Sequence, residues 1–181
     1  MTTLGYIVGS LSRDSINRRL AQALVAAAPT GCEFVEIPIV GLPQYNPDHD
    51  HMYPPAAARL KALIETVDGV VVVTPEYNRT FPGALKNAID FASRPWGETS
   101  WTGKPVALLG TGLNSAGTAV AQSHLRSVLT YCGAQVLGLP ETCVPWSEDL
   151  FDADGRPSAT LSDQLTSFLV ATLAHTRRYA A

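Results

Sequence analysis

Residues 69–74 read Gly-Val-Val-Val-Val-Thr, a run of β-branched side chains in which apolar and polar positions do not alternate. Such a run is typical of a parallel strand that helices cover on both faces. Leu85, Ala88, Ile89 and Ala92 follow it at the spacing of one face of a helix. Because a buried strand followed by an amphipathic helix is the repeating unit of α/β proteins, we expect that fold class.

The same alternation extends in both directions along the chain. Further strands are predicted at Leu4–Val8, Phe34–Ile37, Val106–Leu109 and Val136–Leu139. Helical stripes of apolar residues run from Ile16 to Ala27, from Leu60 to Val67, from Leu125 to Cys132 and from Leu161 to Leu169. Strands separated by helices in this way imply a five-stranded parallel sheet with helices on both faces, since right-handed crossovers wind helices onto the sheet.

The composition fits a single folded domain over residues 1–181, with 46% hydrophobic and 16% charged residues and no interdomain linker. This balance excludes a disordered polymer. Thirteen Lys and Arg against sixteen Asp and Glu give a net charge of −3. That charge is too mild for a protein whose main partner is nucleic acid or an anionic membrane, so we expect neither.

The apolar runs and the amino terminus argue against a membrane or an exported protein. No run approaches the roughly 20 apolar residues of a spanning helix, and the first residues, MTTLGYIVGS, contain no basic leader. We therefore predict a cytoplasmic location.

The three cysteines, Cys32, Cys132 and Cys143, are odd in number and widely spaced, which fits neither a disulfide framework nor a CxxC metal site. We expect them to be buried packing residues.

Function is expected in three loops of the predicted sheet. In open parallel sheets, ligands bind beyond the carboxyl ends of the strands, where the winding direction reverses. The loops that follow the first, third and fourth predicted strands span Gly9–Ser15, Pro75–Pro82 and Gly110–Gly117. These loops should share one edge of the sheet.

The first loop has the chemistry of a phosphate site. The sequence GSLSRDSIN, residues 9–17, places Ser10, Ser12, Ser15, Asn17 and Arg13 at the start of a helix. Free N–H groups and the positive end of the helix dipole attract a phosphate there, and the hydroxyls and the guanidinium add directed donors. The alternative is that a serine or aspartate of this loop only caps the helix.

The common nucleotide-binding and hydrolase motifs are absent from the expected places. The stretch Gly97–Pro105 lacks the spacing of a phosphate-binding P-loop and precedes a strand, and the glycines of the third loop do not form GxGxxG. Leu113 stands where a GxSxG elbow around Ser115 would need glycine. The pair His49 and His51 lacks further metal ligands, so we expect no metal.

The second and third loops suit a planar ligand. Pro75 and Pro82 bracket the second loop and restrict its backbone, so its amides can be held rigidly against a ring. A flavin needs such fixed donors to stabilise the negative charge of its reduced form. The alternative is a common proline-rich loop in which Glu76 and Arg79 form an exposed ion pair. Glycines in the third loop allow close backbone approach.

The connection Pro38–Pro55 is unusually long and contains two tyrosines and two histidines. Connections of this length are often lids or interface elements. It could flank a cofactor or a second subunit, or it could be a proline-rich surface loop.

Four segments together resemble the NADPH-dependent FMN reductase family, which includes flavin, quinone, azo-dye and chromate reductases. They are GSLSRDSINRRLA, LPQYNPD, DGVVVVTPEYNRTFPGALKNAIDFASRP and the glycine loop before SHLRSVL. The segment from TPEYN to LKNAID is the most specific. The resemblance implies a flavodoxin-like three-layer sandwich with strand order 2-1-3-4-5.

The resemblance also implies roles for individual residues. The first loop would hold the FMN phosphate through Ser10, Ser12, Arg13, Ser15 and Asn17. The second loop would lie along the isoalloxazine through Pro75, Glu76, Tyr77 and Asn78, chiefly by backbone groups, and Ser115 and Gly117 belong to the matching third loop.

The implied activity is hydride transfer from NADPH or NADH through bound FMN to a small acceptor such as a quinone, a flavin, an azo compound or a metal oxyanion. The flavin carries the reactive chemistry, so no catalytic side chain is assigned. Relatives are commonly homodimers or homotetramers. An electron carrier of flavodoxin type, without its own NAD(P)H turnover, is the alternative, and a net charge of −3 argues against it because such carriers are more acidic.

Overall fold

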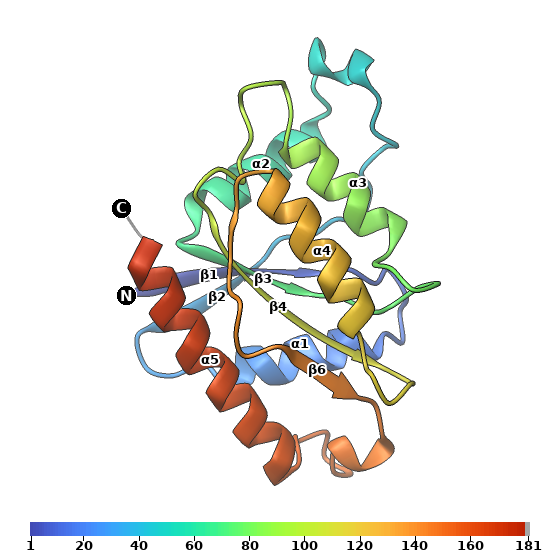
Figure 1. Cartoon of the computed structure of the whole chain (residues 1–181), viewed down its shortest axis with the longest axis vertical. Helices are drawn as coiled ribbons and strands as arrows, with labels where there is room; N and C mark the ends of the chain where they lie inside the picture. The colour runs from blue at the N-terminus through green and yellow to red at the C-terminus, as the bar shows by residue number, and fades with distance from the viewer. Residues whose placement is uncertain (180–181) are drawn as a thin grey trace.

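The computed structural model describes residues 1–179 as a parallel sheet covered by helices on both faces (Figure 1). Its first four strands are β1 (Thr2–Val8), β2 (Cys32–Glu36), β3 (Gly69–Val73) and β4 (Pro105–Gly112). The order β2-β1-β3-β4-β5 confirms the predicted topology, with the winding direction reversed between β1 and β3.

The β-branched run of residues 69–73 is the central strand, β3. All five residues of β3 are buried, and β3 pairs in parallel with β1 on one side and with β4 on the other. Alternate side chains enter two separate cores, with Val70 and Val72 in one and Val71 and Val73 in the other. Burial on both faces explains why the sequence of this strand does not alternate.

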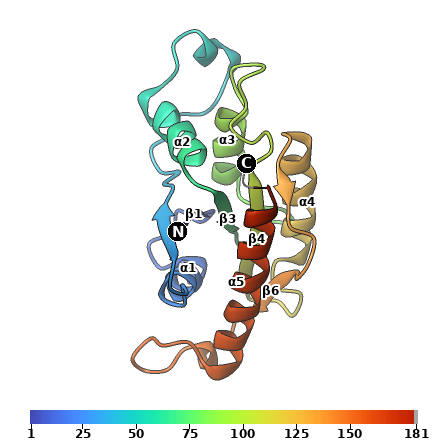
Figure 2. The ribbon, with the colours of Figure 1, turned by 90° about the vertical axis from the view of Figure 1, so that its left-hand side faces the viewer.

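Three helices cover one face of the sheet and two cover the other (Figures 1 and 2). Helices α2 (Pro55–Thr66), α3 (Gly83–Ala92) and α4 (Ala119–Tyr131) pack on the first face, and α1 (Ile16–Ala26) and α5 (Ala159–Tyr179) pack on the second. The predicted stripes match these helices. Ala27, Val67 and Cys132, the last residues of three stripes, each lie one residue past the helix end.

The fifth position in the sheet differs from the prediction. In place of a strand at Val136–Leu139, two short segments pair with β4, namely β5 (Gln135–Val136) and β6 (Thr142–Pro145). Val106 pairs with Val136 and Leu109 pairs with Thr142, so the chain loops out between the two segments. Pro140 lies in this loop and has no N–H to donate to a ladder, which accounts for the interruption.

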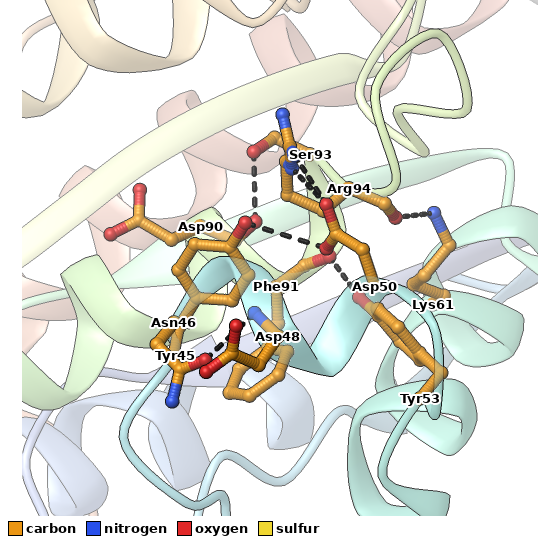
Figure 3. A network of polar contacts seen from close by, with 10 residues as sticks. All are labelled: Tyr45, Asn46, Asp48, Asp50, Tyr53, Lys61, Asp90, Phe91, Ser93 and Arg94. Atoms are coloured by element: carbon orange, nitrogen blue, oxygen red, sulfur yellow. Dashed lines mark hydrogen bonds and ion pairs between the residues drawn. The ribbon is translucent and has the colours of Figure 1, made fainter.

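The long connection Pro38–Pro55 packs against the carboxyl end of α3 (Figure 3). It contains the short 3₁₀ helix η1 (Pro47–Asp50), and a second one, η2 (Glu148–Leu150), follows β6. The Arg94 guanidinium donates to the Asp50 carboxylate, with Nε at 2.9 Å, and the Tyr53 hydroxyl donates to the Phe91 carbonyl. Burial is the main cause that raises the pKa of Tyr53 well above its ordinary value.

Candidate functional site

The three predicted loops follow the carboxyl ends of β1, β3 and β4, at the right-hand end of the sheet in Figure 1. Residues from all three loops line one cavity. Its volume is about 470 Å³, within the range of about 300–1,000 Å³ for small-molecule sites. The lining consists of Ser10, Ser12, Asp14, Ser15, Ile16 and Asn17 from the first loop and α1, Pro75, Glu76 and Tyr77 from the second loop, and Thr111, Gly112, Leu113 and Asn114 from the end of β4 and the third loop.

The first loop forms the amino terminus of α1. Ser15 is the N-cap, and its Oγ accepts the N–H of Arg18 at 3.3 Å, so the capping alternative is correct for this serine. The Ser10 Oγ accepts the N–H of Ser12 at 3.3 Å and lies 3.3 Å from the Tyr77 hydroxyl. N–H groups of the first turn have no partner within a helix, and here they lie beside the cavity. The terminus therefore offers an anion the donors expected of it.

Asn17 connects the first loop to the third. It is 1% exposed, its Nδ2 donates to the Thr111 carbonyl at 2.9 Å, and its Oδ1 accepts the Thr111 N–H at 3.0 Å. Both polar ends of the side chain are engaged by the main chain of one residue, 94 positions away. The observed role of Asn17 is therefore to fix the end of β4 against the start of α1.

The second loop contains a tight hairpin. The N–H of Tyr77 donates to the Thr80 carbonyl at 2.8 Å, and the N–H of Thr80 donates to the Tyr77 carbonyl at 3.0 Å. Between them, Asn78 and Arg79 have φ angles of 50° and 66°. The ion pair that the alternative interpretation placed between Glu76 and Arg79 is present at 3.7 Å, but only its Arg79 side is exposed, because Glu76 is mainly buried. The hairpin therefore holds its shape through main-chain bonds.

The third loop begins with a close approach to the second. A Cβ at Gly110 would lie 2.3 Å from the Thr74 carbonyl oxygen, so glycine is required there. The next residue, Thr111, is 1% exposed, and its Oγ1 is buried without a hydrogen-bond partner among the described residues. A buried hydroxyl without a partner is unfavourable in the free protein, so a ligand group is its expected partner.

Four predicted site residues do not line the cavity. Arg13 lines two smaller neighbouring cavities of about 220 and 340 Å³. Asn78 and Ser115 are exposed, and Gly117, at a φ of 58°, lies against the β6 backbone. The cavity is instead completed by Asp14, Ile16, Thr111, Gly112, Leu113 and Asn114, which the predicted set omitted. The position of Thr111, two residues past the predicted strand Val106–Leu109 and within β4 in the structure, was a usable signal.

The described residues show no metal centre and no membrane-spanning helix. Within residues 1–179 no group of three or more His, Cys, Asp or Glu could hold a metal ion. None of the helices in this range combines the length and apolar character that a bilayer crossing requires. The three cysteines are free, and burial raises the pKa of each thiol. Cys32 is buried as expected, whereas Cys132 and Cys143 are half-buried.

Fold and site together define a flavodoxin-like protein with a mononucleotide-sized cavity at its topological switch point. Comparison with known families identifies it more closely. Residues 2–147 match the family model of the NADPH-dependent FMN reductases. The chain belongs to this family.

Individual relatives agree with the assignment. A 2-hydroxy-1,4-benzoquinone reductase of Burkholderia sp. is 47% identical over 84% of both chains, and a quinone reductase of Pseudomonas putida is 37% identical over 93% of this chain and 89% of its own. The solved structure of FerB, a flavoenzyme NAD(P)H:(acceptor) oxidoreductase from Paracoccus denitrificans, superimposes with a TM-score of 0.95 at 37% identity, covering 100% of each chain.

The protein is therefore an oxidoreductase that uses FMN and NAD(P)H. The residues of the cavity fit FMN on two structural observations. The amino terminus of α1 with its three serine hydroxyls suits the phosphate, and the unpartnered Oγ1 of Thr111 lies in a residue that lines the same cavity.

Proposed function

We propose that this chain binds FMN in the three-loop cavity and reduces quinones with electrons from NAD(P)H. When bound there, FMN would supply the transfer of two electrons from NAD(P)H to the acceptor. With one further proton from solvent, a quinone becomes a hydroquinone and NAD(P)H becomes NAD(P)⁺. The convergence of the three loops on one cavity at the α1 terminus is the observation that carries the proposal.

The phosphate would be held by Ser10, Ser12 and Ser15 together with the first N–H groups of α1. Asn17 would act indirectly, because its amide is already engaged by Thr111. Arg13 can contact the phosphate only after its side chain turns away from the two neighbouring cavities. It would therefore contribute positive charge to the phosphate site more than a fixed hydrogen bond.

The isoalloxazine would lie against the second and third loops. Pro75, Glu76, Tyr77 and Asn78 would contact it chiefly through main-chain groups, and the segment that contains Ser115 and Gly117 would cover its other edge. Rigid main-chain N–H groups stabilise the anionic reduced flavin without rearrangement. The rigidity of the hairpin and the close approach at Gly110 support this placement.

Two features support quinones as the acceptor class. Relatives that cover most of this chain are named quinone reductases. In addition, Tyr77 lines the cavity while its side chain is 48% exposed, and Leu113 lines it at 84% exposure. A flat aromatic acceptor above the flavin can stack against such surfaces.

The proposal is tested with purified protein and FMN. We expect a yellow protein, or one that turns yellow on FMN titration, and rapid oxidation of NADPH or NADH in the presence of 1,4-benzoquinone. Protein that neither takes up FMN nor oxidises NAD(P)H would contradict the proposal. Bound FMN that stays oxidised when NADPH is mixed in a stopped-flow instrument would favour the electron carrier.

Variants locate the phosphate site. Changing Ser10 and Ser12 together to Ala should weaken FMN binding about tenfold or more, because each removes a hydroxyl from the expected phosphate cradle. Ser167→Ala is the matched control, since Ser167 is exposed on α5.

Arg13→Ala should weaken FMN affinity more than it changes the reduction rate of the FMN-saturated protein. The opposite pattern would show that Arg13 is not a phosphate residue.

We also propose a homodimer or homotetramer, as the family resemblance implies. Trp96 and Tyr131 are 81% and 85% exposed and line one groove, which supports a contact surface there. Light scattering after size-exclusion chromatography measures the oligomeric state, and a monomer at micromolar concentration would contradict the proposed assembly.

A single domain over residues 1–181 and a cytoplasmic location remain predictions from the sequence.

A further inference from the structure

The hairpin of the second loop carries an arginine where glycine is normal. Asn78 and Arg79, at φ angles of 50° and 66°, are the two central residues of a tight two-residue turn between Tyr77 and Thr80. Turns with both central residues in the left-handed region are type I′, and their preferred sequence is Asn-Gly. Asn78 fits that preference and Arg79 does not.

The left-handed backbone is unfavourable for arginine. Asparagine visits this region because its short side chain can bond locally, whereas a longer side chain gains nothing comparable. Residues held in such conformations cluster at functional sites, where surrounding contacts fix them. Arg79 has a positive φ, which is uncommon for arginine. We therefore looked for a function of its side chain.

Side-chain contacts anchor the hairpin to α4 and to the first loop. The Glu76 carboxylate accepts the Ala121 N–H of α4 at 3.2 Å, and the Thr80 hydroxyl lies 3.1 Å from Nδ1 of His124 on the same helix. On the other side, the Tyr77 hydroxyl contacts Ser10 at 3.3 Å. The main chain of Arg79 is therefore fixed relative to the site.

Arg79 is an exposed cation paired with a residue that lines the cavity. Its Nη1 lies 3.7 Å from Oε1 of Glu76, a lining residue, while its own side chain is 76% exposed. Glu76 is only 6% exposed and also receives a main-chain N–H at the α4 terminus, whose dipole partly balances the carboxylate. Asp14, the other acid of the lining, lies on the first loop. The second loop is neutral overall, but of its two charged side chains only the Arg79 guanidinium is exposed, so the positive end of the pair faces solvent.

We propose that Arg79 is a specificity residue for acceptors that carry a negative charge, in particular hydroxylated quinones. This inference rests on the proposed quinone reduction. A 2-hydroxyquinone is a vinylogous carboxylic acid and is ionised at neutral pH, with the charge shared between two oxygens. A guanidinium presents several donors in one plane to such an anion, and an exposed one also attracts it over distance.

The test compares 2-hydroxy-1,4-benzoquinone with neutral 1,4-benzoquinone in the FMN-loaded enzyme. Arg79→Gln removes the charge but keeps the strained backbone, and Arg79→Lys keeps the charge. Arg79→Gly removes the charge and relieves the strain, so its melting temperature should equal or exceed that of the wild type. These three variants separate charge from folding.

We expect Arg79→Gln and Arg79→Gly to lower kcat/KM for the hydroxyquinone about fivefold at low ionic strength, the upper effect of an exposed ion pair. The kcat/KM for 1,4-benzoquinone should stay unchanged in all three variants. Arg79→Lys should retain most of the preference for the hydroxyquinone over 1,4-benzoquinone. Added salt should lower this preference in the wild type toward the preference of Arg79→Gln.

The deciding quantity is kcat/KM for the hydroxyquinone divided by kcat/KM for 1,4-benzoquinone. If this ratio is the same in the wild type and in Arg79→Gln, the inference is overturned. A change confined to the ratio of NADPH to NADH would overturn it as well, because it would assign the cation to the 2′-phosphate of the nucleotide. In both cases, retained turnover of 1,4-benzoquinone would leave the proposed function intact. Loss of all quinone turnover in the wild type would contradict the proposed function itself.

Discussion

The substitution Asn17→Ala would break the connection between the first and third loops. It removes two hydrogen bonds, at 2.9 and 3.0 Å, from the main chain of Thr111, which is 1% exposed. Each buried main-chain group left without a partner costs about 1–3 kcal/mol. Water entering from the adjacent cavity would reduce that cost, and alanine improves helix propensity by about 0.5 kcal/mol. We expect the free energy of unfolding of the apoprotein to fall by about 2 kcal/mol.

Two measurements follow from this expectation. Urea denaturation of the apoprotein gives the stability change, and quenching of FMN fluorescence gives the dissociation constant. Because the end of β4 would no longer be fixed against α1, FMN should bind about tenfold more weakly, which corresponds to about 1.4 kcal/mol. Gln22→Ala is the matched control, since it removes an exposed amide from the same helix and should change stability by less than about 0.5 kcal/mol.

The outcome separates a positioning role from direct binding. A direct phosphate ligand would affect FMN affinity and leave the apoprotein as stable as the Gln22→Ala control. If Asn17→Ala behaves in that way, the two hydrogen bonds do not have the energetic role assigned to them. Weaker FMN binding with an unchanged apoprotein would therefore refute the reasoning.

Three further predictions concern single groups. Thr111→Val should raise apoprotein stability by up to about 1 kcal/mol, because it removes a buried hydroxyl without a partner, while weakening FMN binding; equal FMN affinity would contradict it. Gly110→Ala should lower stability by about 2–3 kcal/mol in thermal denaturation, since its Cβ would lie 2.3 Å from the Thr74 carbonyl oxygen; an unchanged melting temperature would disagree. Burial raises the pKa of Tyr53 above its ordinary 10.0, so the folded protein keeps a proton that the unfolded chain loses, and stability should decline as the pH rises above that value. Tyr53→Phe should show a shallower decline, and parallel pH profiles would count against this cause.

The fold was predictable because its signals are local. The β-branched run of β3 and the helical stripes report burial directly, and parallel topology follows from their alternation. The strand β6 was missed because Thr142–Pro145 is short and ends in proline. Its pairing with β4 over Leu109–Gly112 is a long-range contact that leaves no periodic pattern.

The sequence predicted the location of the candidate site in the fold better than it predicted the contacts of individual side chains there. The rule that strand ends converge located all three loops correctly. It could not assign the Asn17 amide to Thr111, because that bond joins residues 94 positions apart. The hairpin was also hidden, since Arg79 replaces the glycine that normally marks such a turn.

The three loops are held together by contacts within the protein itself, and this bears on how FMN is recognised. Asn17 joins the first loop to the third, the contact between Ser10 and Tyr77 joins the first to the second, and the close approach at Gly110 joins the second to the third. A cavity fixed in this way loses little conformational entropy on binding, so more of the contact energy appears as affinity. The Asn17 amide, whose two polar ends are both used within the protein, therefore sets the shape of the cavity. The serine hydroxyls and the first N–H groups of α1 are the groups that we propose bind the cofactor.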